Sequence, residues 1–208
     1  MKINVKKTLV DSILAGVCIS LGGMVFLKVV GVMGAILFSF GLITVICYKL
    51  KLYTGVSGFV RTKQDFAELP LVIIGNIVGC FGVALCAREA SPDVVATAQG
   101  LLEARLGKNL LQVGLLAMGC GFVMTTVVTF ARQGQWLPLL FGIPLFILCG
   151  FYHSIADAFY ITTACGVSDY TWPVAALYAM ELVGNFVGCN LYRFFQKLAR
   201  VGETAQKG

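Results

Sequence analysis

Charged residues are scarce in this chain of 208 residues. Asp, Glu, Lys and Arg together make up 12%, whereas about a quarter of an average soluble chain is charged. Hydrophobic residues reach 58%, and the mean hydropathy is +0.87. This balance excludes a soluble globular domain and predicts a single integral membrane domain over residues 1–208.

Several chemical motifs are missing as well. The eight cysteines include no Cys-x-x-Cys pair, and the single histidine offers no ligand spacing of the zinc or haem kinds. No Gly-rich phosphate loop, dinucleotide fingerprint or catalytic triad pattern occurs. We therefore expect no metal, no cofactor and no enzyme active site. The cysteines, spread through apolar segments, are expected to act as small hydrophobic residues.

Six apolar stretches with few charges run through the chain. A transmembrane helix needs roughly 20 mostly apolar residues, and each stretch is at least about that long. They cover residues 8–30, 32–53, 69–87, 110–131, 136–163 and 172–195. The first is too long for a signal peptide and lacks a cleavage pattern, so it is expected to be a true span. The polar link 88–109, which contains Pro92 and Asp93, predicts a short surface helix.

Basic residues set the expected orientation. Six spans place both termini on one side of the membrane, together with the links at 61–68 and 132–135. The basic residues of that side are Lys2, Lys6, Lys7, Arg61, Lys63, Arg132, Arg193, Lys197, Arg200 and Lys207, with Lys49 and Lys51 nearby. Those of the other side are Lys28, Arg88, Arg105 and Lys108. The positive-inside rule predicts cytoplasmic termini in the inner membrane, so the net charge of +6 needs no nucleic-acid partner.

The chain contains an internal duplication. The pattern Gly-Asn-x-Val-Gly-Cys occurs at 75–80 and again at 184–189, a separation of 109 residues because 184 − 75 = 109. Each half has three spans, one half over about 8–87 and the other over about 110–197. Three is an odd number, so the second half is expected to lie inverted in the membrane. Transporters built from inverted repeats place their binding region near the midplane, where the repeats meet.

The middle span of each half shows signs of interruption. At 49–55, two lysines, a threonine and a glycine stand where a plain span would continue, and 162–166 has a similar break in the fifth span. With the repeat shift of 109 residues, Thr54 corresponds to Thr163 (54 + 109 = 163). The alternative is that both segments are span ends followed by a turn. Non-helical backbone at membrane depth is tolerated only where it is buried in protein or lines a wet cavity, so breaks would mark a pore.

Small residues that let transmembrane helices pack closely recur in both halves. They are Gly16, Gly75, Gly79, Gly184 and Gly188. Asn76 and Asn185 stand between such glycines. A membrane-buried amide needs hydrogen-bond partners, which the freed backbone of a broken helix can supply. We favour this structural role for both asparagines, with direct solute contact as the alternative.

His153, Asp157 and Glu181 lie well inside the fifth and sixth spans. Ionisable side chains are energetically costly at membrane depth, so each is a candidate functional residue. His153 can give or take a proton near neutral pH; its alternative role is a neutral imidazole that ties two helices together. Asp157 follows it by four residues, so both are expected on one helix face. Asp157 and Glu181 could pair with Lys49 or Lys51, or they could repel anions.

The sequence around the histidine is similar to a known signature. Gly-Phe-Tyr-His-Ser-Ile-Ala-Asp-Ala-Phe at 150–159 resembles the Gly-Phe-Glu-His-Ser-Ile-Ala-Asn-Met-Phe signature of the formate/nitrite transporter family. Leu-Tyr-Thr-Gly at 52–55 resembles the family's Leu-Phe-Thr-Gly loop, Phe-Ser-Phe-Gly-Leu at 38–42 its second span, and the repeated Gly-Asn pattern its third and sixth spans. The resemblance covers nearly the whole chain.

The resemblance implies an all-α, aquaporin-like fold of six transmembrane helices, with broken second and fifth helices, assembled as a homopentamer with one pore per protomer. It also assigns residues to the substrate path. These are His153 and Thr54 at the centre, Asn185 in their network, Phe38 and Phe146 at the outer constriction with Leu42 deeper, and Leu52 and Tyr53 at the inner one.

Three positions depart from the family pattern. Tyr152 occupies the position of the family's glutamate before the histidine, and Asp157 occupies that of its asparagine four residues after the histidine. Lys51 occupies the position of the family's acidic residue before the loop. Lys108 lies close to a family lysine that opens the fourth span. Together with Glu181, these residues predict a rearranged charge network along the pore.

These features together predict a pore for small monovalent anions of weak acids, such as formate, nitrite or hydrosulfide. A bare anion in a hydrophobic constriction costs several kcal/mol, so we hypothesise that the solute is protonated near His153 and Thr54 and crosses as the neutral acid. Two other classes stay open. A water or polyol pore shares the fold, although Asn76 and Asn185 lack the proline of Asn-Pro-Ala turns. A membrane-embedded enzyme or redox protein would depend on the cysteines and His153.

Overall fold

The computed structural model describes residues 3–205, and the regular elements in that range are all helical. Lys2 and Lys207, and the side chain of Arg200, lie outside the described part. The long helices are α1 (Val5–Val29), α2 (Gly31–Cys47), α4 (Lys63–Ala90), α5 (Pro92–Leu106), α6 (Leu110–Arg132), α7 (Leu137–Leu148), α8 (Ser154–Ala164) and α9 (Trp172–Ala205). The short ones are α3 (Tyr53–Val56) and the 3-10 turns η1 (Ser57–Phe59) and η2 (Val167–Asp169).

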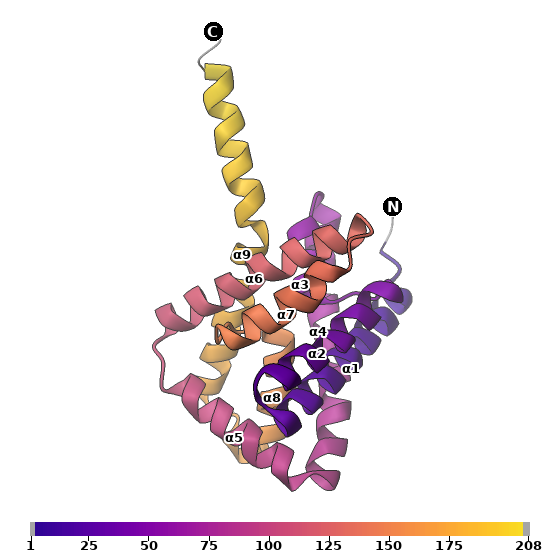
Figure 1. Ribbon diagram of the computed structural model, residues 1–208, viewed down its shortest axis with the longest axis vertical. Helices are drawn as coiled ribbons and strands as arrows, with labels where there is room; N and C mark the ends of the chain where they lie inside the picture. Colours follow the sequence, from indigo (N-terminus) through magenta and orange to yellow (C-terminus); the bar gives the residue numbers. More distant parts are fainter. Residues whose placement is uncertain (1–2, 206–208) are drawn as a thin grey trace.

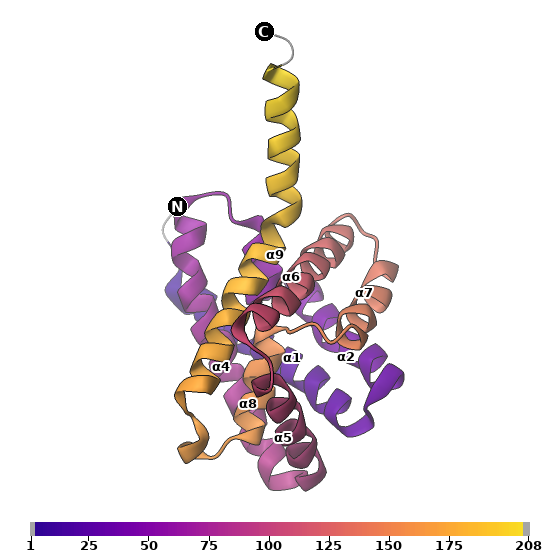
Figure 2. The ribbon, with the colours of Figure 1, turned by 90° about the vertical axis from the view of Figure 1, so that its left-hand side faces the viewer.

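The helices form two groups with the same pattern of contacts. α1 packs against α2 and α4, α6 packs against α7 and α9, and α2 meets α7 between the groups. α8 lies in the interior, where all its residues are buried and it contacts α1, α4, α5 and α9. Figures 1 and 2 show this bundle, with the last part of α9 projecting beyond it.

Four helices of the described chain are long and apolar enough to cross a membrane, namely α1, α4, α6 and α9. α2 and α7 are apolar but shorter. The predicted fifth stretch, 136–163, is divided between α7 and α8. The helix predicted in the polar link is confirmed as α5, which begins at Pro92, a favourable first position because proline lacks the N–H that a helix start leaves free.

Glycines permit the closest helix contacts. A Cβ added at Gly79 of α4 would lie 2.1 Å from the carbonyl oxygen of Ile13 in α1, and one at Gly188 of α9 would lie 2.0 Å from that of Met118 in α6. Both distances are far below any real contact of a methyl group. The two helix pairs therefore pack backbone against backbone, as the small residues predicted.

We expect Gly79→Ala to destabilise the protein, because the new methyl group would overlap a helix carbonyl that cannot rotate away. The cost should be about 1–3 kcal/mol, which corresponds to a melting temperature lower by roughly 3–10 °C for a chain of this size. Gly82→Ala on the same helix is the matched control, since a Cβ there meets nothing within 4 Å. Equal melting temperatures of the two purified variants in detergent would contradict this packing.

Two non-helical segments, here called the first and the second break, separate α2 from α3 and α7 from α8. α2 ends at Cys47 before α3 begins at Tyr53, and α7 ends at Leu148 before α8 begins at Ser154. Each interruption contains a residue with left-handed backbone, Lys49 with φ 55° and Gly150 with φ 67°. The prediction of a break at 162–166 is wrong, because that segment is the C-terminal end of α8 and the turn after it.

The reason for this error lies in the spacing of the repeat. Lys49 and Gly150 are 101 residues apart (150 − 49 = 101), whereas Asn76 and Asn185 are 109 apart (185 − 76 = 109). The second half therefore has eight more residues between its break and its asparagine. Most of them form α8, which has 11 residues against 4 in α3. A single shift taken from the asparagines cannot locate both breaks.

Candidate functional site

Asn76 holds the backbone at the first break. Its Nδ2 donates to the carbonyl oxygens of Ser12 (2.7 Å) and Lys51 (2.9 Å), and its Oδ1 accepts from the N–H of Tyr53 (2.9 Å). The side chain is fully buried. Backbone groups released by the end of α2 are therefore paired inside the protein, where leaving them unpaired would be costly.

Asn185 makes the same three bonds at the second break. Its Nδ2 donates to the carbonyl oxygens of Ala117 (2.8 Å) and Tyr152 (2.8 Å), and its Oδ1 accepts from the N–H of Ser154 (2.9 Å). This is the structural role that the sequence favoured for both asparagines. Both amide hydrogens and the carbonyl oxygen of Asn185 are engaged with backbone, so it stabilises the segment that carries His153.

The two breaks bring Thr54 and His153 together although 99 residues separate them. Thr54 Oγ1 lies 2.8 Å from His153 Nε2. The Nδ1 of His153 accepts from the N–H of Ala156 (3.0 Å), so the proton of a neutral ring is on Nε2 and points to Thr54. Both residues are buried, with exposed fractions of 2% for His153 and 0% for Thr54.

His153 is the N-cap of α8 rather than a residue inside a helix. Its backbone is extended, with φ −107° and ψ 102°. The expectation that His153 and Asp157 project from one helix face is therefore wrong: the main chains are bonded, Asp157 N–H to His153 O at 2.8 Å, but the histidine lies before the first turn. The cap places the imidazole in the break itself.

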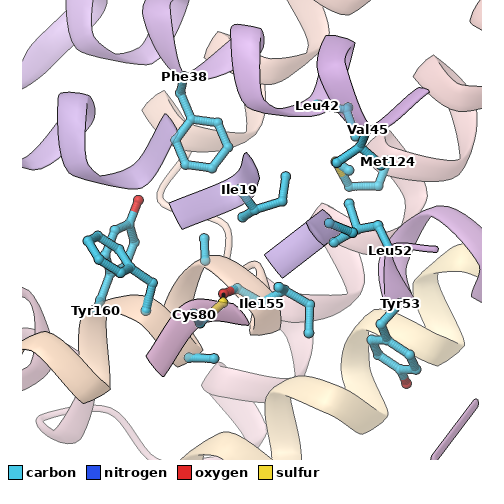
Figure 3. Close-up of a cluster of buried hydrophobic side chains, with 14 of the residues drawn as sticks. Ile19, Phe38, Leu42, Val45, Leu52, Tyr53, Cys80, Met124, Ile155 and Tyr160 are labelled. Atoms are coloured by element: carbon cyan, nitrogen blue, oxygen red, sulfur yellow. Dashed lines mark hydrogen bonds between the residues drawn. The ribbon is translucent and has the colours of Figure 1, made fainter. Parts of the chain in front are cut away.

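Aromatic rings cover one side of the histidine. The ring of Phe146 stacks on His153 with centroids 5.8 Å apart and an angle of 29°. Phe38 meets Phe146 edge-on at 6.1 Å. Figure 3 shows Leu42 and Leu52 together in another part of the buried core, away from Phe38. All four side chains are at most 3% exposed, and Phe146 gives the histidine an apolar neighbour on one side.

Two cavities flank this apolar centre. The α5 cavity, of about 240 Å³, is lined by Phe26, Arg105, Lys108, Phe146, Tyr152, His153, Asp157 and Tyr160, among others. The Lys51 cavity, of about 660 Å³, is lined by Leu42, Lys49, Lys51, Leu52, Arg132 and Trp136, among others. Phe26 is in the last turn of α1, whereas Lys51 bonds Thr8 in its first turn. The cavities therefore lie toward opposite ends of α1.

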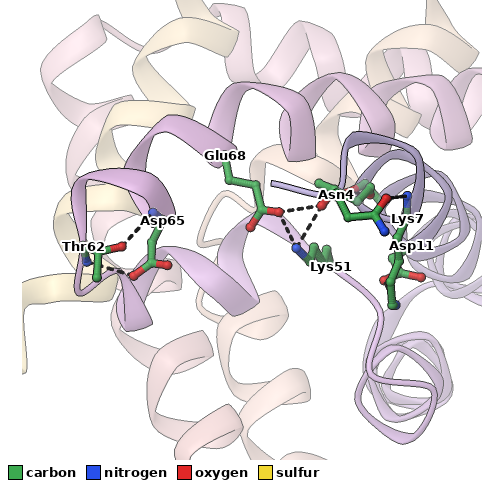
Figure 4. A network of polar contacts seen from close by, with 9 residues as sticks. Asn4, Lys7, Asp11, Lys51, Thr62, Asp65 and Glu68 are labelled. Atoms are coloured by element: carbon green, nitrogen blue, oxygen red, sulfur yellow. Dashed lines mark hydrogen bonds and ion pairs between the residues drawn. The ribbon is translucent and has the colours of Figure 1, made fainter. Parts of the chain in front are cut away.

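The lysine beside the first break is paired. Lys51 Nζ contacts Glu68, as Figure 4 shows. It also donates to the hydroxyl of Thr8 at 3.0 Å. These side chains keep 29% (Lys51) and 23% (Glu68) of their surface exposed. Lys51 therefore lines its cavity as one member of an ion pair. Lys49 lines the same cavity and forms no ion pair within the described part of the chain.

Asp157 pairs with a residue that the sequence did not single out. Arg105 of α5 donates to both its carboxylate oxygens, Nε to Oδ2 at 3.0 Å and Nη2 to Oδ1 at 2.7 Å. Pairing of Asp157 or Glu181 with Lys49 or Lys51, one of the two alternatives that the sequence left open, is therefore not found in the described residues. The physical reason is that α5 docks on α8 and brings in a cation from 52 residues away, a contact that no local pattern reveals.

Five predicted residues lie outside both cavity linings, namely Thr54, Asn185, Phe38, Tyr53 and Glu181. Tyr53 points toward α9, where its hydroxyl donates to the carbonyl oxygen of Leu182 at 2.9 Å. Glu181 is fully buried, and neither of its carboxyl oxygens has a hydrogen-bond partner among the described residues. Lys108, in contrast, lines the α5 cavity as an exposed cation.

The protein has helices of membrane length and two breaks that are held by asparagines and meet at a buried histidine and threonine. A basic cavity lies on either side of this contact. These features define a membrane channel or transporter. The family follows from comparison: residues 1–195 match the family model described as formate/nitrite transporter. The chain belongs to the formate/nitrite transporter family, and the resemblance seen in its motifs is confirmed.

Relatives and solved structures agree with this family. The chain is 28% identical to the uncharacterized transporter YrhG of Bacillus subtilis (strain 168), over 90% of this chain and 79% of the relative. It is 24% identical to the formate channel BtFdhC of Bacillus thuringiensis, over 86% and 81%. A pentameric formate channel with formate bound has the same fold, with a TM-score of 0.80, 18% identity and coverage of 95% and 97%.

A second solved structure, an FNT family ion channel, matches with a TM-score of 0.79 and 19% identity, covering 93% of this chain and 91% of the other. These relatives are channels or transporters and not enzymes. The enzyme class and the neutral-solute pore considered from the sequence are therefore not favoured.

Proposed function

We propose that this chain forms a channel for small monovalent anions of weak acids, of the class of formate, nitrite and hydrosulfide. The observation that carries the proposal is the buried contact between His153 and Thr54, placed between two cavities that both carry basic side chains. A relative that is a formate channel and a similar structure with formate bound support the substrate class.

The proposed channel crosses the inner membrane six times as one domain over residues 1–208. The crossings are α1, α2 with α3, α4, α6, α7 with α8, and α9, in two inverted halves whose second and fifth crossings are broken. The basic residues of the termini and adjacent links support cytoplasmic termini. The pentameric state of a similar structure supports a homopentamer with one pore per protomer.

In the proposed mechanism, basic side chains attract the anion into a cavity. These are Lys108 on one side, and Lys49 and Arg132 on the other. Arg105 and Lys51 line the same cavities, but Asp157 and Glu68 neutralise their charges. A charge cannot pass the buried centre cheaply, because its desolvation costs several kcal/mol. The constricting side chains are Phe38, Phe146, Leu42 and Leu52, with Tyr53 and Asn185 as supports of the breaks.

At this barrier the anion takes a proton from hydronium in the cavity, giving the neutral acid and water, and the acid releases the proton on the far side. His153 orients the solute through its Nε2–H. In the hydrogen bond between His153 and Thr54, Nε2–H is the donor and the Thr54 oxygen is the acceptor. The hydroxyl hydrogen of Thr54 is therefore free to bind the same solute. Each anion that crosses is therefore accompanied by one proton.

Uptake into proteoliposomes tests this function. With an inward proton gradient, formate, nitrite and hydrosulfide should enter at least tenfold faster than into protein-free liposomes, and the larger lactate should enter more slowly. Osmotic swelling in water alone is the control. Rapid water flux without uptake of any of the three anions would overturn the proposal and revive the neutral-solute pore.

A further inference from the structure

Three ionisable side chains from three different helices meet behind the α5 cavity. Arg105 comes from α5, Asp157 from α8 and Glu181 from α9. The side chain of Arg105 is 12% exposed and that of Asp157 is not exposed at all. Glu181 is also fully buried. The cluster therefore holds two fully buried carboxyl groups and one guanidinium that reaches the edge of the cavity.

Asp157 forms a bidentate pair with the guanidinium of Arg105. Two donors of Arg105 bind the two oxygens of Asp157, and a third reaches the carbonyl oxygen of Leu101 at 3.4 Å. The rings of Tyr152 and Tyr160 lie on the guanidinium at 4.7 and 5.6 Å. This bidentate pair is electrically neutral, and Arg105 makes no hydrogen bond to Glu181 within the described residues.

Glu181 lies close to Asp157 without a cation of its own. The other titratable groups that face it are Tyr152 before α8, Cys120 of α6 and Tyr178 of α9, and none of them carries a positive charge. An ionised carboxylate there would be a second negative charge beside Asp157 with no hydrogen bond to its oxygens. Burying such a charge costs several kcal/mol, whereas a neutral carboxylic acid avoids most of that cost.

We propose that Glu181 is a proton-binding site that keeps its proton in the conducting channel and thereby determines how readily anions are admitted to the α5 cavity. This inference rests on the proposed anion channel. With Glu181 protonated, Arg105 and Asp157 cancel, and Lys108 gives the cavity a charge of +1. Loss of the proton from Glu181 adds −1, which cancels Lys108 and removes the attraction for an incoming anion.

Glu181→Gln tests the inference because glutamine has the shape of the protonated acid and cannot ionise. Formate uptake by this variant should exceed that of the wild type several-fold at alkaline pH, and the ratio of the two rates should fall as the pH is lowered. Glu103→Gln, which removes an exposed acid of α5, should follow the wild-type pH profile. A Glu181→Gln profile that coincides with the wild type, or loss of its uptake at every pH, would overturn the proposal.

Infrared spectroscopy gives a second readout that a purely structural role would not change. The wild type at neutral pH should show the carbonyl stretch of a protonated carboxylic acid, and Glu181→Gln should lack it. In Asp157→Asn, Arg105 loses its partner and becomes available to Glu181, so the band should weaken as Glu181 ionises. No such band in the wild type would refute the proton site. Absence of anion uptake by the wild type would instead refute the proposed function and leave the band unaffected.

Discussion

His153→Ala is expected to lower formate uptake by about tenfold, the effect of raising the barrier by roughly 1.4 kcal/mol, because the solute loses the Nε2–H that orients it at the barrier. The substitution removes the Nε2–H that faces Thr54 and the Nδ1 that caps α8. The remaining uptake should keep its dependence on pH, because hydronium in the cavity supplies the proton that crosses with each anion. Initial rates in proteoliposomes across a series of pH values measure both effects.

His153→Asn separates the two roles of the histidine. Asparagine is a favourable N-cap, so this variant should keep the start of α8, but its short side chain does not reproduce the imidazole contact with Thr54. We expect the same loss of uptake with a melting temperature near that of the wild type. Uptake at the wild-type rate in both His153 variants, without sensitivity to pH, would contradict the mechanism.

Thr54 offers a matched pair of variants for the same contact. Thr54→Val keeps the shape and removes the hydroxyl that lies 2.8 Å from Nε2, whereas Thr54→Ser keeps the hydroxyl. The valine variant should share most of the loss seen in His153→Asn and the serine variant should retain most of the uptake. Equal losses in valine and serine would indicate that shape, and not the hydroxyl, matters at this position.

The sequence predicted the parts of the structure that depend on neighbouring residues. Apolar length predicted α1, α4, α6 and α9, and small residues predicted the close contacts at Gly79 and Gly188. The duplicated Gly-Asn pattern predicted amides bonded to freed backbone, which Asn76 and Asn185 confirm. These features follow from hydrophobicity, side-chain volume and hydrogen-bonding capacity, all of which are readable from the chain alone.

Features that depend on how helices dock could not be predicted in the same way. The second break, at 149–153, lies 13 residues before the expected 162–166 (162 − 149 = 13), because α8 is longer than α3 and one repeat shift cannot locate both breaks. Arg105 was counted only as one basic residue of a link, and its partner Asp157 is known only once α5 lies on α8. The sequence therefore indicated that charges inside the membrane must be compensated but not which cation compensates them.

Arg105→Met is expected to destabilise the protein by about 3–5 kcal/mol, the range for removing one partner of a buried ion pair. Asp157 would keep a charge at zero exposure beside the second acid, Glu181. Lys51→Met removes the cation of a pair whose side chains are 29% and 23% exposed, so water replaces much of the interaction and the loss should be about 1 kcal/mol or less. Denaturant or thermal unfolding in detergent compares the two variants.

The double variant Arg105→Met with Asp157→Asn decides whether the uncompensated charge is the cause. It leaves no ion in the site, so most of the lost stability should return, because well-packed neutral groups often replace a buried pair at little cost. Lys108→Met, which removes a cation from the same cavity without breaking an ion pair of the described residues, should leave stability nearly unchanged. If the double variant is as unstable as Arg105→Met, the packing of the guanidinium between Tyr152 and Tyr160, and not its charge, holds α5 on α8.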